Sequence, residues 1–128
     1  MATSTTPTPT ALSVTITPSS AGAKIALSLS GGYSIRNYNS GYIMLYRDGQ
    51  NTMAGPSYWS RLFFGAASGD EMKNFSIDYV DAPGTTAAVT YQIYLAVDNN
   101  AAVNQFCLAA RCTDALDMGR VTLIAREL

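Results

Sequence analysis

Apolar and polar side chains alternate with a period of two along most of this chain. The clearest case is residues 89–97, where Val, Tyr, Ile, Leu and Val occupy every second position. Successive side chains of a β-strand point to opposite faces of a sheet, so this alternation is typical of a strand with one buried face. Because no stretch shows a helical period over more than two turns, the sequence predicts an all-β fold.

Turn sequences separate the alternating runs, among them residues 18–22 (PSSAG), 48–49 (DG) and 81–84 (DAPG), and Gly31-Gly32 is expected to break the chain after the second run. Proline and glycine supply the backbone conformations that tight turns require. About eight strands are expected, at residues 12–17, 25–30, 42–47, 58–64, 74–79, 89–97, 106–110 and 121–128. The Ala-rich stretch 101–110 is also compatible with a short helix. The number and spacing of the strands favour a jelly-roll-like antiparallel β-sandwich.

The first ten residues show no apolar periodicity and are mostly Thr, Ser and Pro. Such a stretch buries too little apolar area to fold alone, and its prolines favour an extended backbone. We therefore expect an extended N-terminal arm over residues 1–11 and one jelly-roll β domain over residues 12–128. The arm residues expected to bind a partner are Thr3, Ser4, Thr5, Thr6, Pro7, Thr8, Pro9 and Thr10. A frayed terminus is the alternative.

The chain carries few charges. Charged residues make up 13% of it and the formal net charge is −1, against a usual charged share of about 25%. A low charge fits a surface that neighbouring subunits cover. The basic residues form no cluster, so nucleic-acid binding has no support. No apolar run approaches the roughly 20 residues that span a membrane, and the N-terminus does not resemble a signal peptide, so synthesis in a cytoplasm is expected.

The chain contains no histidine, which excludes Ser-His-Asp triads and imidazole metal sites. Close carboxylates occur at Asp70 and Glu71 and again at Asp114 and Asp117. A glycan hydrolase uses such a pair, and loop carboxylates can bind calcium. Because turn geometry also explains carboxylates in loops, we expect no enzyme activity, no catalytic residue, no metal and no cofactor.

The two cysteines, Cys107 and Cys112, are five positions apart. In one continuous strand they would lie roughly 16 Å apart, whereas a disulfide needs Cα atoms within about 7 Å. A bridge would require a sharp turn between them. Two free thiols, packed as small core residues, are therefore expected.

Tyrosine is frequent, with eight residues. If Ile43 and Leu45 face the core, the residues that alternate with them point outward. Tyrosine and methionine are enriched at protein interfaces. The residues expected at a subunit interface are Tyr42, Met44, Tyr46 and Tyr94. A sheet covered on both sides within one chain would place the same residues in the core.

An aromatic platform that stacks on sugars is another use of such residues. Tyr58 and Trp59 are adjacent and would supply it. The composition does not choose between a subunit contact and a glycan site.

Four stretches follow one another in a characteristic order: TPSSAGAKI at 17–25, LYRDG at 45–49, DAPGTT leading into VTY at 81–91, and VTLIAREL at 121–128. Together they resemble the small β modules of structural proteins of tailed bacteriophages. Those modules are similar in style to trimeric jelly rolls of the tumour-necrosis-factor type. The resemblance spans most of residues 12–128.

The resemblance implies a virion structural protein. One expectation is a homotrimeric capsid decoration, or cement, protein on the outer capsid surface, which binds the major capsid protein and bridges capsid subunits through its arm. The alternative is a receptor- or glycan-binding knob of a phage tail or collar fibre. Because no coiled-coil or shaft-like stretch precedes residue 12, the decoration protein is the favoured expectation.

Overall fold

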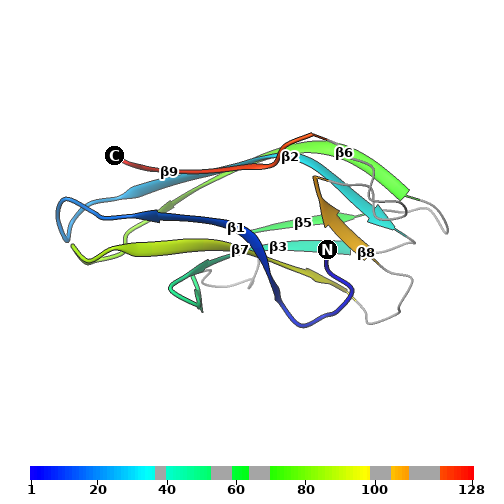
Figure 1. Ribbon diagram of the computed structural model, residues 1–128, viewed down its shortest axis with the longest axis horizontal. Coiled ribbons are helices and arrows are strands. Elements are labelled where there is room, and N and C mark those ends of the chain that lie inside the picture. Colours follow the sequence, from blue (N-terminus) through cyan, green and yellow to red (C-terminus); the bar gives the residue numbers. More distant parts are fainter. Residues whose placement is uncertain (37–39, 53–58, 64–69, 99–104, 110–118) are drawn as a thin grey trace.

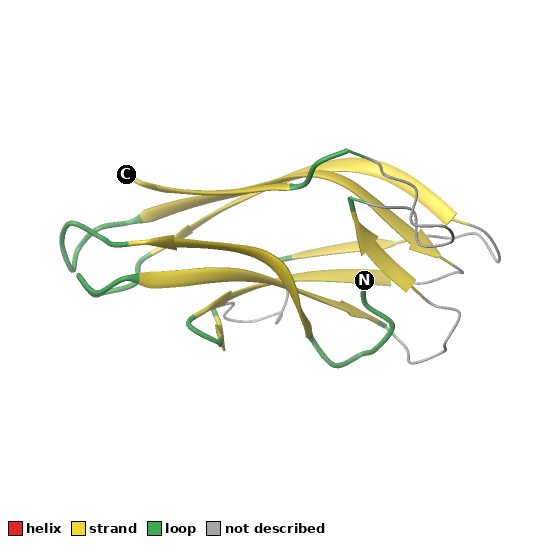
Figure 2. Cartoon of the chain, in the orientation of Figure 1, coloured by secondary structure: helices red, strands yellow, loops and turns green. Residues whose placement is uncertain are grey.

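The computed structural model describes residues 1–36, 40–52, 59–63, 70–98, 105–109 and 119–128. In this part of the chain there are strands and turns but no helix, and therefore no helix able to span a membrane (Figure 2). The strands are β1 (Thr8–Ile16), β2 (Ile25–Arg36), β3 (Ser40–Arg47), β4 (Gln50–Asn51), β5 (Ser60–Phe63), β6 (Asp70–Asp81), β7 (Val89–Val97), β8 (Gln105–Leu108) and β9 (Thr122–Glu127).

The strands form two antiparallel sheets that face each other as the layers of a sandwich (Figure 1). In the first, the β7 sheet, β7 lies between β1 and β3, and both β4 and β5 pair with the other edge of β3. In the second, the β2 sheet, β6 pairs with one edge of β2, while β8 and β9 pair one after the other with its second edge. Because the chain repeatedly crosses from one sheet to the other, the sandwich is jelly-roll-like, and the predicted all-β fold class is confirmed.

The core lies between the two central strands. Leu27 and Leu29 of β2 are fully buried, and so are alternate residues of β7, such as Tyr91 and Ile93. Full burial of one large aliphatic side chain contributes roughly 2 kcal/mol. The inward face that the sequence predicts for residues 89–97 is confirmed.

The strand β2 is longer than expected, because it continues through Gly31-Gly32, where the sequence predicts a break. Gly31 has a φ of 151°, and a Cβ atom there would lie 2.8 Å from the backbone oxygen of Arg120. The glycine therefore allows a close approach of the chain leading into β9 and does not form a turn. The strand β8 lies in the stretch for which a short helix was the alternative.

Cys107 of β8 is disulfide-bonded, so the expectation of two free thiols is wrong. The chain has one other cysteine, Cys112, which lies outside the described residues. The distance argument failed because the strand ends at Leu108. Ala109 then adopts a left-handed φ of 61°, and its N–H donates to the oxygen of Gly32 at 2.9 Å. The chain thus leaves the extended conformation directly after Leu108, which the assumption of one continuous strand did not include.

Gly41 lets a buried aromatic ring lie directly on the backbone of β3. The ring of Phe106 is fully buried, and a Cβ atom at position 41 would lie 2.5 Å from its Cγ atom. The ring also meets Tyr33 edge to face, with centroids 6.2 Å apart. No side chain fits between β3 and Phe106 without moving one of them.

Substitution of Gly41→Ala should lower the free energy of unfolding by about 1–3 kcal/mol, because extra atoms in a filled core force their neighbours to shift. Gly22→Ala is the matched control, since nothing lies within 4 Å of its Cβ position. Denaturant unfolding of both variants measures the difference. Equal stability of the two variants would contradict the close contact.

A buried polar cluster joins the two sheets. Asp81 Oδ2 of β6 accepts a hydrogen bond from the hydroxyl of Tyr91 at 2.7 Å and one from Nη1 of Arg47 at 2.5 Å. Asp81 is buried, and Tyr91 and Arg47 come from neighbouring strands of the opposite sheet. Burial, together with the hydrogen bond to Asp81, raises the pKa of Tyr91 well above its ordinary value. The tyrosine therefore remains a hydrogen-bond donor at neutral pH.

Substitution of Asp81→Ala should lower the free energy of unfolding by roughly 2–3 kcal/mol, because the Tyr91 hydroxyl and the Arg47 guanidinium both lose their acceptor. Water can replace that acceptor in part for Arg47, which is partly exposed, but not for the buried Tyr91. Tyr91→Phe removes one hydroxyl and should cost about 1 kcal/mol. Thermal unfolding at neutral pH compares the two. A larger loss in Tyr91→Phe than in Asp81→Ala would show that the carboxylate is not the centre of the cluster.

Candidate functional site

The β7 sheet turns one face away from the core, and the four residues predicted at a trimer interface gather on it. Met44 of β3 lies directly opposite Tyr94 of β7. Tyr42 and Tyr46 lie two positions before and after Met44, so their side chains share its face. We call Tyr42, Met44, Tyr46 and Tyr94 the tyrosine face. The structure brings these residues together, and their contact with a partner stays a prediction.

The rings of Tyr46 and Tyr94 stack on each other, with centroids 3.8 Å apart and an angle of 15° between the planes. Two hydrogen bonds hold β1 against β7 beside these rings. Gln92 Nε2 of β7 donates to the backbone oxygen of Thr10 at 2.7 Å, and the hydroxyl of Thr10 donates to the backbone oxygen of Ile93 at 2.9 Å. These aromatic side chains are ordered within the free subunit. A partner therefore loses little affinity to their immobilisation.

Met44 contributes less to this surface than the sequence indicates. It points to the tyrosine face but is only 4% exposed. A side chain already removed from water gains little further burial from a partner. Met44 therefore forms the floor of the tyrosine face, and Tyr42, Tyr46 and Tyr94, which are half-buried, supply its accessible area.

The predicted free arm lies against the body of the domain. Ala2 is 1% exposed, and it exchanges two backbone hydrogen bonds with Phe106, of 2.8 and 3.0 Å. The oxygen of Ser4 accepts a hydrogen bond from the N–H of Val97 at 2.9 Å. Alanine is small enough for this buried position, and the segment satisfies backbone groups at the ends of β8 and β7. Since β1 already begins at Thr8, the expected boundary after residue 11 is also shifted.

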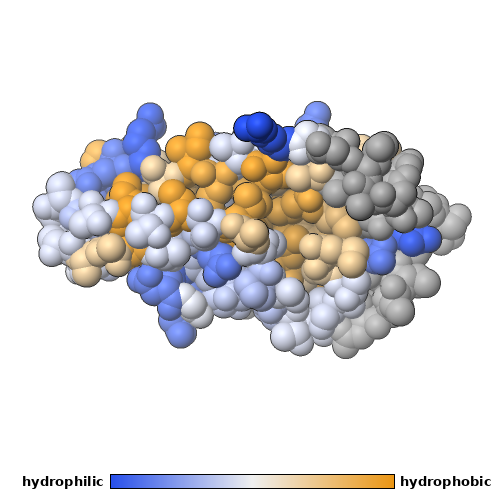
Figure 3. Space-filling model, in the orientation of Figure 1, coloured by the Kyte–Doolittle hydropathy of each residue, from blue (hydrophilic) through white to orange (hydrophobic). Residues whose placement is uncertain are grey.

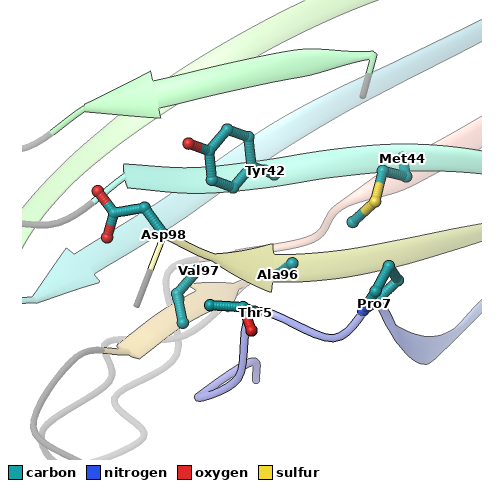
Figure 4. Close-up of a pocket in the computed structure, with 7 residues that line it drawn as sticks. All are labelled: Thr5, Pro7, Tyr42, Met44, Ala96, Val97 and Asp98. Carbon is teal, nitrogen blue, oxygen red and sulfur yellow. The ribbon is translucent and has the colours of Figure 1, made fainter. Parts of the chain in front are cut away.

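A pocket of about 360 Å³ lies where the N-terminal segment, residues 1–7, meets the tyrosine face (Figure 4). Its lining residues are Thr5, Pro7, Tyr42, Met44, Ala96, Val97 and Asp98. Most of these side chains are apolar, and Asp98 adds a carboxylate that lies near the hydroxyl end of Tyr42 in Figure 4. The volume is at the low end of ligand pockets. It therefore suits a single side chain of a protein partner.

A second hollow, of about 220 Å³, opens on the side of the sandwich where β1 and β9 lie next to each other. Both strands are fully described, and each pairs with a strand of its own sheet but not with the other. Apolar residues gather along this side (Figure 3). The hollow is lined by Met1, Thr10, Ala11, Leu12, Leu95, Leu108, Ala109 and Val121. The sequence does not indicate this hollow, because its residues come from the predicted arm and from separate strands that only the tertiary structure brings together.

The alternative glycan platform is partly engaged within the domain. Trp59 Nε1 donates a hydrogen bond to the backbone oxygen of Asp78 at 3.2 Å, and its ring meets Tyr79 edge to face. Trp59 is half-buried against the core. Tyr58 lies outside the described residues. The structure thus assigns Trp59 a packing role between β5 and β6.

Of the carboxylates considered for catalysis, Glu71 forms an ion pair with Lys73, which raises the pKa of that lysine. The side chain of Asp70, and residues 114 and 117, lie outside the described part of the chain. Among the residues described, no three His, Cys, Asp or Glu side chains are grouped as a metal site would require.

The docking of the N-terminal segment can be tested by placing the same charged residue at a buried position and at its exposed neighbour. Ala2→Asp should release the segment, because an unpaired carboxylate is costly to bury, whereas the exposed neighbour Thr3 tolerates Thr3→Asp. Amide hydrogen exchange at Phe106 and Val97, whose N–H groups donate to the segment, should be roughly tenfold faster in Ala2→Asp. Identical exchange in the two variants would show that the segment is not docked in solution.

Comparison with protein-family models, curated proteins and solved structures finds no match. The tyrosine face, the sandwich that presents it and the sequence resemblance are therefore the features that bear on function.

Proposed function

We propose that this protein is a capsid decoration protein of a tailed bacteriophage, which binds the outer capsid surface through the tyrosine face and the adjoining N-terminal segment. The observation that carries the proposal is the joining of these two elements at one pocket. The sequence resemblance supports the virion assignment. The trimeric arrangement that this resemblance implies remains part of the proposal. Because the tyrosine face meets the capsid in this proposal, the trimer contact that the sequence predicts there is assigned to another surface.

The chemistry of the surface favours protein binding. Tyrosine presents a large, ordered contact area with a polar end, and it is common among the residues that dominate binding energy. The stacked rings of Tyr46 and Tyr94 are such a contact area. The pocket beside them would accept a side chain of the major capsid protein. A ligand that binds the assembled shell but not its free subunits stabilises the shell by mass action.

The disulfide of Cys107 also supports this assignment. Disulfides persist in oxidising surroundings, and virion surfaces are among them. A protein made in a host cytoplasm and released on a virion would form the bond after release. The location on the outer capsid surface is therefore consistent with the cysteine chemistry.

The proposal is tested by cosedimentation with capsids that lack the protein. The double variant Tyr46→Ser/Tyr94→Ser should bind at least about tenfold more weakly than the wild type, because it removes two aromatic contacts. Thr15→Ala/Thr90→Ala is the matched control. In the wild type, the hydroxyls of Thr15 and Thr90 form an exposed hydrogen bond with each other on the same sheet.

Saturable binding by the wild type and the control, with loss in the tyrosine variant, supports the proposal. Binding that is equal in all three proteins would exclude the tyrosine face as the contact. A wild-type protein that ignores capsids and binds glycans on an array would favour the receptor-binding knob instead.

A further inference from the structure

The outer face of the β2 sheet lies on the opposite side of the sandwich from the tyrosine face. Five large apolar side chains are exposed among the described residues, and two of them, Met1 and Leu128, are chain ends. The other three belong to β6 and β9: Met72 is 46% exposed, Val80 52% and Ile124 55%. By strand register all three point to this outer face. The three side chains therefore share one face, on which Val80 and Ile124 lie near each other and Met72 lies toward the other end of β6.

Toward one end of this face, near the start of β2 and the end of β6, two rows of paired residues form a regular pattern. In the first row, Val80 of β6 and Arg126 of β9 flank Ala26 of β2. In the second row, Asp78 of β6 and Ile124 of β9 flank Ser28. Val80 and Ile124 thus occupy one diagonal of the pattern. The oppositely charged Asp78 and Arg126 occupy the other diagonal. We call these six residues the diagonal patch.

The middle strand of the diagonal patch carries small residues, so another surface can approach closely. The hydroxyl of Ser28 donates a hydrogen bond to Oδ1 of Asp78, which holds that carboxylate over the sheet. The backbone oxygen of Asp78 accepts from Trp59. Asp78 is therefore fixed from two sides, and Arg126 on the other flank is exposed.

We infer that the diagonal patch is a contact with a second copy of this chain, related by a two-fold axis in the plane of the interface. An axis along the diagonal from Val80 to Ile124 places each of these residues against its own counterpart. The same rotation places Asp78 against Arg126 of the second copy, and Arg126 against Asp78 of the second copy. A contact of this kind is isologous, and both ion pairs form at once.

Other two-fold axes do not give this match. An axis parallel to the strands would bring Val80 against Arg126, and an axis perpendicular to them would bring Val80 against Asp78. From the usual strand spacing and rise, the diagonal axis makes the strands of the two copies cross at roughly 70°. This is close to the orthogonal class of sheet packing. Charge complementarity therefore selects one arrangement.

This inference is independent of capsid binding and of the proposed function. It predicts an even number of chains in the isolated assembly, whether the two-fold contact acts alone or joins trimers in pairs. Light scattering or sedimentation over a range of protein concentrations measures that number. One chain or three chains per particle at all concentrations would overturn the inference.

Charge reversal tests the reciprocal ion pairs. Asp78→Arg and Arg126→Asp should each weaken self-association by about tenfold or more, because like charges then meet twice. The double variant restores opposite charges and should regain most of the wild-type affinity. Ser13→Arg, at an exposed position on the opposite sheet, is the control and should leave the mass unchanged.

Circular dichroism of each variant establishes that the sheet is intact. Loss in both single variants with recovery in the double variant supports the inference. An even-numbered assembly that neither reversal weakens, or a double variant no stronger than the single ones, overturns it. Capsid binding is measured separately, with the tyrosine variants. A failure of the two-fold contact can therefore be told apart from a failure of the capsid-binding proposal.

Discussion

The burial of alternate residues of β2 and β7 against each other is the interaction on which the rest of this structure depends. Both strands are central in their sheets, and their inward side chains are almost completely excluded from water. Because successive residues of a strand point to opposite sides, this burial also decides what the outer faces present. The tyrosine face and the diagonal patch are therefore direct consequences of how the core is packed.

The two outer faces differ in chemistry. One carries stacked tyrosines beside a pocket that the N-terminal segment helps to form. The other carries small residues between a diagonal of apolar side chains and a diagonal of opposite charges. A module that binds a partner through one face and its own copy through the other can bridge neighbouring sites on a lattice. The low overall charge fits a protein with two covered faces.

Several expectations failed at places where distant parts of the chain meet. The Gly31-Gly32 pair was expected to end a strand, yet β2 continues through it and Gly31 allows the chain before β9 to pass close to β2. The polar, proline-containing N-terminus was expected to extend as an arm toward a partner, yet one small residue, Ala2, fits a buried position beside Phe106 of the same chain. Cys107 was expected to be a free thiol because the strand was assumed to continue. Each error concerns a contact that local composition does not encode.

The sequence by itself determined the all-β class, the inward face of residues 89–97 and the common face of Tyr42, Met44 and Tyr46, because period-two alternation is a local property of the backbone. The position of Tyr94 on that same face depends on the pairing of β3 with β7. Only the tertiary structure decided which strands are neighbours, since pairing joins residues far apart in the chain. It placed Asp78 and Arg126 on either side of β2 and docked the N-terminal segment beside the tyrosine face. The pocket and the diagonal patch exist only through those long-range pairings.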